Sequence, residues 1–226
     1  MSGFPKQSES DCDAFDTGHS STSMSVALGM AKARDLRGED RKIFAVIGDG
    51  ALSGGMAFEA MNNAARLKSN MVIVLNDNQM SISKNVGGMS SYLGKIRTNG
   101  NYTELKEEVE NALSKLPHLG DKLTSRIRGF KDLVKRVLIP GMLFEDMGLT
   151  YIGPIDGHNI QQMVTAFESA SKMKEAVIVH VCTRKGKGYR PAEQNPSYFH
   201  GVSPFNLKDG RSRKTVESAQ TYTDIF

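Results

Sequence analysis

Short apolar runs alternate with segments of helical periodicity in the first part of the chain. The runs Lys42–Gly48 and Asn70–Asp77 are continuously apolar and rich in β-branched residues, which is typical of strands covered on both faces, as in a parallel sheet. Between them, small and apolar residues recur at helical spacing from Met56 to Leu67. The three segments predict a β-α-β unit with adjacent parallel strands.

A second set of elements follows the same pattern. Ala176–Thr183 is predicted as a further strand, and the helix before it is expected to begin at Asn159, where Gln162 completes a capping-box pattern. Tyr151–Asn159 is interpreted as a short strand and its turn. Ser21–Leu36 carries small residues on most sides and predicts a closely packed helix.

Two other segments break the alternation. Lys84–Asn101 is rich in Gly, Ser and Asn and is predicted to be a long surface loop. Apolar residues at helical spacing then predict a helical insertion at 101–139. We therefore expect an α/β fold, with a mostly parallel sheet and helices on both faces. One domain is expected over residues 1–205, and residues 206–226 are interpreted as a linker toward a second domain.

Composition narrows the class of protein only slightly. The 226 residues carry a net charge of +4. This mild positive charge favours phosphorylated substrates but is too small to indicate binding of nucleic acid. No apolar run approaches the roughly 18 residues of a membrane span, and the N-terminus shows no signal pattern. The isolated Cys12 and Cys182 form no metal or redox motif and favour a reducing compartment. We expect a cytoplasmic protein that contacts neither nucleic acid nor membrane.

Polar clusters follow both strands of the β-α-β unit. Gly-Asp-Gly ends the first strand and Asn-Asp-Asn ends the second. The carboxyl ends of neighbouring parallel strands meet at one edge of a sheet, so the Asp49 carboxylate and the Asn78 amide oxygen are expected to lie together. Oxygen ligands suit a hard cation, and the small residues after Gly50 open a helix whose N-terminus favours anions. The pattern predicts a divalent ion beside a diphosphate.

Each cluster taken alone is also ordinary turn chemistry, because Asp-Gly and Asn-Asp-Asn are common in turns. Their occurrence on consecutive strands, with small residues between, favours the binding site. A Walker-type nucleotide loop is excluded, since no G-x-x-x-x-G-K-[ST] sequence occurs.

Longer segments resemble a known family. A Gly-Asp-Gly followed just under thirty residues later by an Asn-bearing turn is the thiamine diphosphate motif. The segments that carry the resemblance to the 1-deoxy-D-xylulose-5-phosphate synthase family are TGHSSTSMSVALGMA, GDGALSGGMAFEAMNNA, LNDNQMSIS, YIGPIDGHN and KGKGYRPAE. Transketolase is a near relative, but it usually has Glu where this chain has Gly54. The resemblance implies a thiamine-diphosphate-binding, transketolase-like fold and a homo-oligomer.

The resemblance also implies roles for single residues. Asp49, Asn78 and the Met80 carbonyl would hold Mg²⁺, and His19 and His200 would reach the reacting centre. The residues expected to contact thiamine diphosphate are Gly18, His19, Ser20, Gly50, Ala51, Asn78 and Tyr189.

Several of these roles have an ordinary alternative. His19 could be part of a helix cap, and Tyr189 could anchor a loop through its ring. Glu59 is expected near a dimer interface, with a solvated carboxylate as the alternative. The remaining histidines are interpreted as structural or exposed groups: His118, His158 and His180.

The resembled enzymes condense pyruvate with glyceraldehyde 3-phosphate, with loss of CO₂. They are longer on both sides, and a second domain grips the aminopyrimidine ring and supplies an activating glutamate. The expected partners are therefore the two substrates, a pyrimidine-binding domain or a subunit carrying it, and a second copy of the chain. We expect the isolated chain to be inactive. The alternatives are a transketolase N-terminal subunit and a noncatalytic diphosphate-binding remnant.

Overall fold

The computed structural model describes residues 2–98, 143–213 and 222. The chain divides into two compact units, Met1–Thr183 and Arg184–Phe226. The predicted insertion at 101–139 lies outside the described residues, and so does most of the linker predicted at 206–226. The boundary expected at residue 205 stays a prediction.

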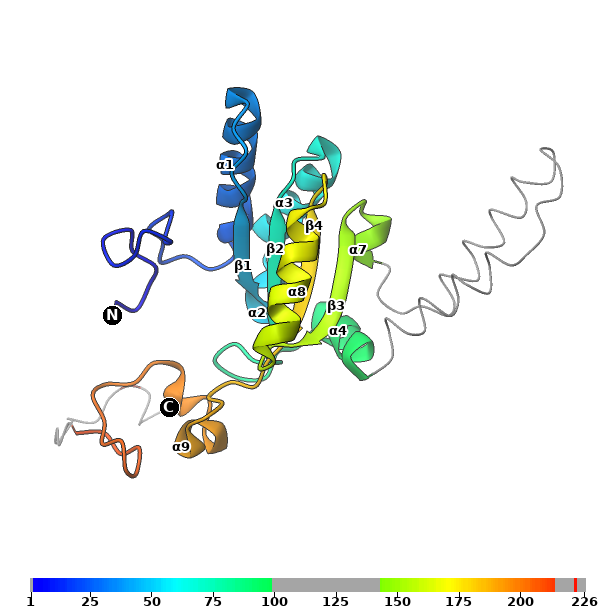
Figure 1. Cartoon of the computed structure of the whole chain (residues 1–226). Coiled ribbons are helices and arrows are strands. Elements are labelled where there is room, and N and C mark those ends of the chain that lie inside the picture. The colour runs from blue at the N-terminus through cyan, green and yellow to red at the C-terminus, as the bar shows by residue number, and fades with distance from the viewer. Residues whose placement is uncertain (1, 99–142, 214–221, 223–226) are drawn as a thin grey trace. The chain divides into compact units, whose positions relative to one another are not determined.

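The first unit is built on a four-stranded sheet in which all pairings are parallel (Figure 1). Its order is β1-β2-β4-β3. The strands are β1 (Phe44–Gly48), β2 (Val72–Asp77), β3 (Thr150–Asp156) and β4 (Val177–Cys182). The predicted strands are confirmed, and Gly48 lies beside Asn76 in the register of the first two.

Side-chain alternation along the strands explains why helices cover both faces. Ile73 and Leu75 face one buried cluster that includes residues of α1 (Ser23–Arg37) and α3 (Gly55–Leu67). Val72 and Val74 face the opposite cluster, which includes residues of α8 (Ile160–Ser171). Because successive strand residues point to opposite faces, a run that is apolar throughout needs cover on both sides. The predicted α/β class with a parallel sheet and helices on both faces is confirmed (Figure 1).

The prediction of a loop over Lys84–Asn101 is wrong, because helix α4 (Gly88–Thr98) forms there. Its Gly and Ser residues are weak helix formers, yet Leu93 and Ile96 are buried in the same core as α1 and α3. Packing of an apolar face commonly outweighs weak local propensity. A short helix, α7 (Leu143–Asp146), buries Phe144 in that core too.

The start of α8 follows half of the predicted capping box. The Asn159 side chain accepts a hydrogen bond from the Gln162 amide at 3.1 Å, as a helix cap requires. The Gln162 side chain accepts from Asp156 instead of returning to the Asn159 amide. The helix therefore begins at Ile160, with Asn159 as its cap.

The second unit is small and aromatic. It contains the short helix α9 (Arg190–Gln194) and a 3₁₀ turn, Tyr198–His200. Among the described residues of the chain, no helix has both the length and the apolar character needed to span a bilayer.

Candidate functional site

The carboxylate of Asp49 is the most unusual group at the carboxyl edge of the sheet. Asp49 opens the short helix α2 (Asp49–Leu52) directly after β1, and only 6% of it is exposed. Its Oδ2 accepts from the Gln79 amide at 2.8 Å. Its Oδ1 is buried and has no hydrogen-bond partner within the described part of the chain. Such an oxygen is costly unless a ligand completes it.

Burial also changes the acidity of this group. Burial raises the pKa of Asp49 from an ordinary value of 3.8 to about 6, and a hydrogen bond and charge repulsion with Asp77 act in the same direction. Two neighbouring carboxyl groups favour ionisation of only one at a time. A divalent cation would relieve both the repulsion and the unsatisfied oxygen.

The loop after β2 brings the second predicted ligand to the same edge. The amide of Gln79 contacts both Asp49 and Asp77, so residues Asn78–Met80 lie against the start of α2. Asn78 Oδ1 accepts from the Met80 amide at 3.0 Å. An amide oxygen has two lone pairs, so this turn leaves one available to an ion.

The oxygen atoms of Asp49, Asn78 and Met80 suit the predicted ion, and Gly50 is a small residue beside them. Asp49 and Asn78 offer side-chain oxygens and Met80 offers a carbonyl, the set that Mg²⁺ prefers. At Gly50, an added Cβ would lie 2.9 Å from the Ser81 Cβ and 3.0 Å from the Asn85 Oδ1. The start of α2 can therefore pack against the loop that carries Ser81 and Asn85 only because this residue has no side chain. The roles of Asp49, Asn78 and Met80 as ligands stay predictions.

A polar cavity of about 210 Å³ opens beside these residues. It is lined by hydroxyl groups, an amide and one ammonium group, which are donors that suit a phosphate. Its lining residues are Asp49, Gly50, Ser53, Ser81, Ser83, Lys84, Asn85, Val86, Met89 and Ser90.

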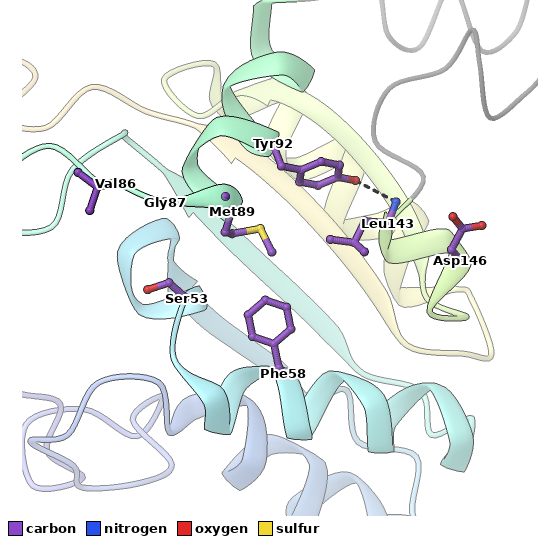
Figure 2. A pocket seen from close by; sticks show the side chains of 9 residues that line it. Ser53, Phe58, Val86, Gly87, Met89, Tyr92, Leu143 and Asp146 are labelled. Atoms are coloured by element: carbon purple, nitrogen blue, oxygen red, sulfur yellow. Dashed lines mark hydrogen bonds between the residues drawn. The ribbon is translucent and has the colours of Figure 1, made fainter.

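A larger, mostly apolar cavity of about 680 Å³ is lined by the residues drawn in Figure 2. It shares Ser53, Val86 and Met89 with the polar cavity. The Tyr92 hydroxyl accepts from the Leu143 amide at 3.0 Å on one wall, and burial raises the pKa of Tyr92 to about 12. Sequence reasoning missed this cavity because it treated the residues of α4 as a loop.

The segment Gly18–Ser20 is exposed and precedes α1. The His19 carbonyl accepts from the Thr22 hydroxyl at 3.0 Å, so the segment forms a hydroxyl-rich helix entry. The neighbouring Ser21 hydroxyl donates to the Ala51 carbonyl at 2.7 Å. That bond joins the segment to α2, next to Asp49.

Tyr189 and His200 both lie in the second unit. The Tyr189 hydroxyl donates to the Leu207 carbonyl at 3.0 Å, and its ring packs against Phe199 and Phe205. The anchoring role considered for Tyr189 is therefore present. His200 Nδ1 lies 2.8 Å from the Lys185 Nζ. The catalytic role of His200 and the cofactor contact of Tyr189 stay predictions.

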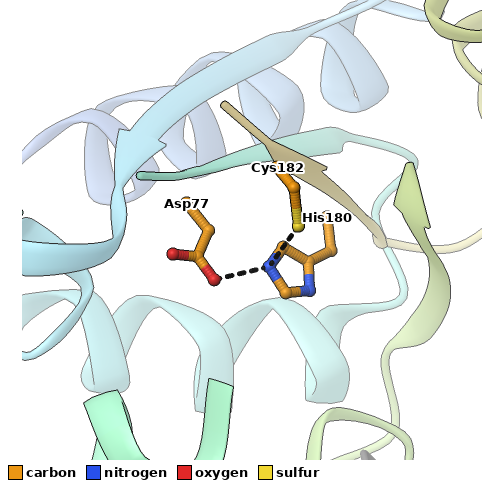
Figure 3. Close-up of side chains that lie close together, drawn as sticks. All are labelled: Asp77, His180 and Cys182. Carbon is orange, nitrogen blue, oxygen red and sulfur yellow. Dashed lines mark hydrogen bonds and ion pairs between the residues drawn. The ribbon is translucent and has the colours of Figure 1, made fainter. Parts of the chain in front are cut away.

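A buried network behind the site was not predicted (Figure 3). His180 Nε2 lies 3.0 Å from Asp77 Oδ2, and its Nδ1 lies 2.7 Å from the Tyr151 hydroxyl. The Arg97 guanidinium donates to Asp77 Oδ1 at 2.8 Å. Asp77 and His180 are 103 residues apart in the chain, so only the pairing of β2 with β4 brings them together.

The charges in this network determine which carboxylate is ionised. Burial alone would raise the pKa of Asp77, but the His180 hydrogen bond, the Asp49 hydrogen bond and the Arg97 charge hold it below its usual value. Burial raises the pKa of the Cys182 thiol to about 11. His180 lies inside a strand, as the sequence predicted, and is wholly buried. Glu59 is exposed on α3, which leaves its predicted interface untested.

Comparison with known proteins connects this site to a family. A family model described as 1-deoxy-D-xylulose-5-phosphate synthase matches residues 1–183. The enzyme of that name from Lachnoclostridium phytofermentans is 64% identical over 226 residues, and the one from Natranaerobius thermophilus is 53% identical. Both alignments cover the whole chain and 36% of the relative. The chain thus spans little more than a third of the length of these relatives.

A solved structure supports the fold independently. Transketolase from Campylobacter jejuni subsp. jejuni NCTC 11168 matches 81% of this chain, and the match covers 23% of the transketolase chain. The TM-score is 0.51 at 23% sequence identity. At this identity the likeness bears on the fold alone, and it confirms the predicted transketolase-like arrangement.

Proposed function

The chain belongs to the 1-deoxy-D-xylulose-5-phosphate synthase family, and we propose that it forms the part of a cytoplasmic synthase that binds thiamine diphosphate and Mg²⁺. The observation that carries this proposal is the buried Asp49 Oδ1, which has no partner within the described residues. It lies beside the Asn78 loop and a cavity lined with groups that can donate hydrogen bonds to phosphate oxygens.

Each residue of the proposed site has a separate task. Asp49, Asn78 and the Met80 carbonyl hold the ion, and the backbone of Gly50 and Ala51 allows the diphosphate to approach closely. Lys84 and the serines of the polar cavity donate to phosphate oxygens. Together these groups fix the phosphate end of the cofactor and leave its reactive ring to other parts of the protein.

Thiamine diphosphate, when bound, would supply the nucleophilic carbon for the decarboxylation of pyruvate and the transfer of a two-carbon unit to glyceraldehyde 3-phosphate. His19 and His200 are proposed to accept and donate protons at the reacting centre, which imidazole does well near neutral pH. Gly18, Ser20 and Tyr189 complete the contacts with the cofactor.

Gly54 is more compatible with a synthase than with a transketolase. An added Cβ at Gly54 would lie 2.4 Å from the Ser21 Oγ and 3.3 Å from the Ala51 carbonyl oxygen. A glutamate at this position, as transketolases usually have, would displace the Ser21–Ala51 hydrogen bond. The local packing therefore favours the synthase as the function of the whole protein.

We propose that the chain acts within a homo-oligomer and together with a pyrimidine-binding domain, and that it does not turn over alone. The test is the release of CO₂ from pyruvate at saturating thiamine diphosphate and Mg²⁺, measured for the chain with and without the complementary domains. Positioning and proton transfer each contribute several kcal/mol to barrier lowering. We expect a rate many orders of magnitude lower for the chain alone. A rate within about tenfold of the joined protein would show a complete site in residues 1–226. No activity in the joined protein would support a noncatalytic remnant.

A further inference from the structure

Asp77 is the centre of a buried hydrogen-bond network at the carboxyl end of β2, and it is 1% exposed. One carboxylate oxygen accepts from Arg97 at 2.8 Å and from the Gln79 amide at 3.1 Å. The other meets His180 at 3.0 Å. Hydrogen-bond partners from β4, from α4 and from the loop after β2 therefore surround the Asp77 carboxylate, as a buried charge requires.

The chemistry of Asp77 determines how His180 is oriented. A carboxylate only accepts hydrogen bonds, so His180 Nε2 donates to it. In the neutral ring, Nδ1 then accepts from the Tyr151 hydroxyl at 2.7 Å. The Tyr151 ring is stacked on Phe144, with the ring planes 6° apart and the centroids separated by 5.9 Å. Core packing thus fixes the ring of Tyr151. The Tyr151 hydroxyl orients the His180 ring, and His180 holds the Asp77 carboxylate in place.

The ligand atoms of Asp77, His180 and Cys182 lie within 4.8 Å of one another (Figure 3), but the cluster is not arranged to bind a metal. The Arg97 guanidinium already compensates the Asp77 charge. The Cys182 Sγ lies 3.9 Å from His180 Nε2, and burial favours the protonated thiol, whereas metals bind the thiolate. The network is better suited to holding protein groups in place.

The group that it holds is the loop after β2. The Gln79 amide points between the Asp77 and Asp49 carboxylates, at 3.1 and 2.8 Å. Gln79 has a φ of +66°, a left-handed conformation that is unfavourable for a residue with a Cβ. Two acceptors on one amide offset that cost. The residues on either side, Asn78 and Met80, are the proposed ion ligands.

We propose that His180 and Tyr151 are positioning residues for the Mg²⁺ site, because they hold Asp77 where it fixes the left-handed Gln79 and aims the Asn78 and Met80 oxygens at one ion. This inference rests on the proposed function. It also explains why two adjacent buried carboxylates have different tasks. Asp77 is satisfied by protein partners, and Asp49 keeps an oxygen for the ion.

The test uses Mn²⁺ as a spectroscopic probe, with electron paramagnetic resonance of the protein that carries the complementary domains. Tyr151→Phe removes one oxygen atom and keeps the stacked ring. Tyr92→Phe is the matched control, because it removes a half-buried hydroxyl whose hydrogen bond is with the Leu143 amide. Outer groups that orient metal ligands typically contribute 10–100-fold to affinity. We expect Mn²⁺ affinity to fall about 3–10-fold in Tyr151→Phe and about 10–100-fold in His180→Leu. We expect less than a twofold change in Tyr92→Phe.

A second readout needs neither metal nor activity. Hydrogen exchange in the metal-free protein, followed on peptides that contain Gln79, is expected to be faster in Tyr151→Phe and unchanged in Tyr92→Phe. Equal exchange and equal Mn²⁺ affinity in Tyr151→Phe and the unmodified protein would overturn the positioning role, even if Asp49→Ala abolishes Mn²⁺ binding. Absence of Mn²⁺ binding to the unmodified protein would instead overturn the proposed function and the ion-directed part of this inference. A lower melting temperature without either change would also contradict the inference.

Discussion

The backbone amide of Gln79 donates to the Asp49 carboxylate across 2.8 Å, although the two residues are 30 positions apart. This bond joins the loop after β2 to the first turn after β1. Because the strands are parallel and adjacent, both segments leave the sheet at the same edge. One carboxylate oxygen of Asp49 is occupied in this way, and the other is buried with no hydrogen-bond partner among residues 2–98 and 143–213.

Replacing Asp49 with Asn should make the metal-free protein more stable. The amide can keep the Gln79 bond through its oxygen and can donate to Asp77 through its nitrogen, which removes the repulsion between two buried carboxyl groups. We expect an increase on the order of 1–2 kcal/mol in the free energy of unfolding at pH 8, as is common when a residue held for function is replaced. The measurement is urea unfolding in the presence of a chelator. Glu168→Gln, which changes an exposed glutamate of α8, is the control for loss of an exposed charge. A less stable Asp49→Asn protein would contradict this prediction.

Mg²⁺ affinity should fall as the pH is lowered through about 6. Burial and the neighbouring Asp77 raise the pKa of Asp49 to about 6 in the metal-free protein, and only the ionised carboxylate binds the ion. Below this pH a proton competes with Mg²⁺, so the dissociation constant should increase about tenfold per pH unit. Above about pH 7 it should be flat. Titration calorimetry from pH 5 to pH 8 checks this, and an affinity that rises on acidification would show that Asp49 is not the ligand.

Gly54→Ala should destabilise the fold although its backbone angles suit any residue, with φ −73° and ψ 141°. The new Cβ would lie 2.4 Å from the Ser21 Oγ, and overpacking of this kind costs about 1–3 kcal/mol. Gly55→Ala is the matched control. It lies one position on in α3 and a Cβ there meets nothing within 4 Å, so it should be neutral or stabilising by up to about 1 kcal/mol. Equal unfolding midpoints for the two variants would disprove the close contact.

Glu59→Ala should weaken assembly. Glu59 is exposed on α3 in the single chain, and its place in the family pattern predicts a protein–protein interface. Sedimentation of the protein with its complementary domains should show a larger dissociation constant of the oligomer for Glu59→Ala. The control is Glu39→Ala, which changes an exposed glutamate after α1 and should leave the dissociation constant unchanged. An unchanged dissociation constant for Glu59→Ala would leave the carboxylate as a solvated surface group.

The central strands β2 and β4 could be predicted from the sequence because they are buried on both faces and are continuous apolar runs. The edge strand β1 is an apolar run too, although Phe44 and Val46 on one of its faces are exposed. The approach of the loop after β2 to Asp49, made through the Gln79 amide, followed from the same reasoning, since carboxyl ends of adjacent parallel strands share an edge. Turn chemistry is present at Asn78, because its oxygen accepts from the Met80 amide. The second lone pair of that oxygen is compatible with the ligand role, which stays a prediction.

Other features depend on contacts that no local pattern records. Helix α4 was missed because its Gly and Ser residues obscure the spacing of Leu93 and Ile96, which the core buries. The Asp77–His180 pair was missed because it depends on β2 lying beside β4. The left-handed Gln79 could not be expected either, since Gln has no preference for that conformation.

The most direct test of the central claim is calorimetric titration of thiamine diphosphate into the protein with its complementary domains, with and without Mg²⁺. We expect tight binding that needs Mg²⁺ in the unmodified protein. We expect a loss of at least about 100-fold in Asp49→Ala, because a direct bond from a carboxylate to the ion and its charge are removed together. Gly88→Ala, where a Cβ meets nothing within 4 Å, should bind as the unmodified protein does. Unchanged, Mg²⁺-dependent affinity in Asp49→Ala would contradict the assignment of this edge of the sheet as the diphosphate site.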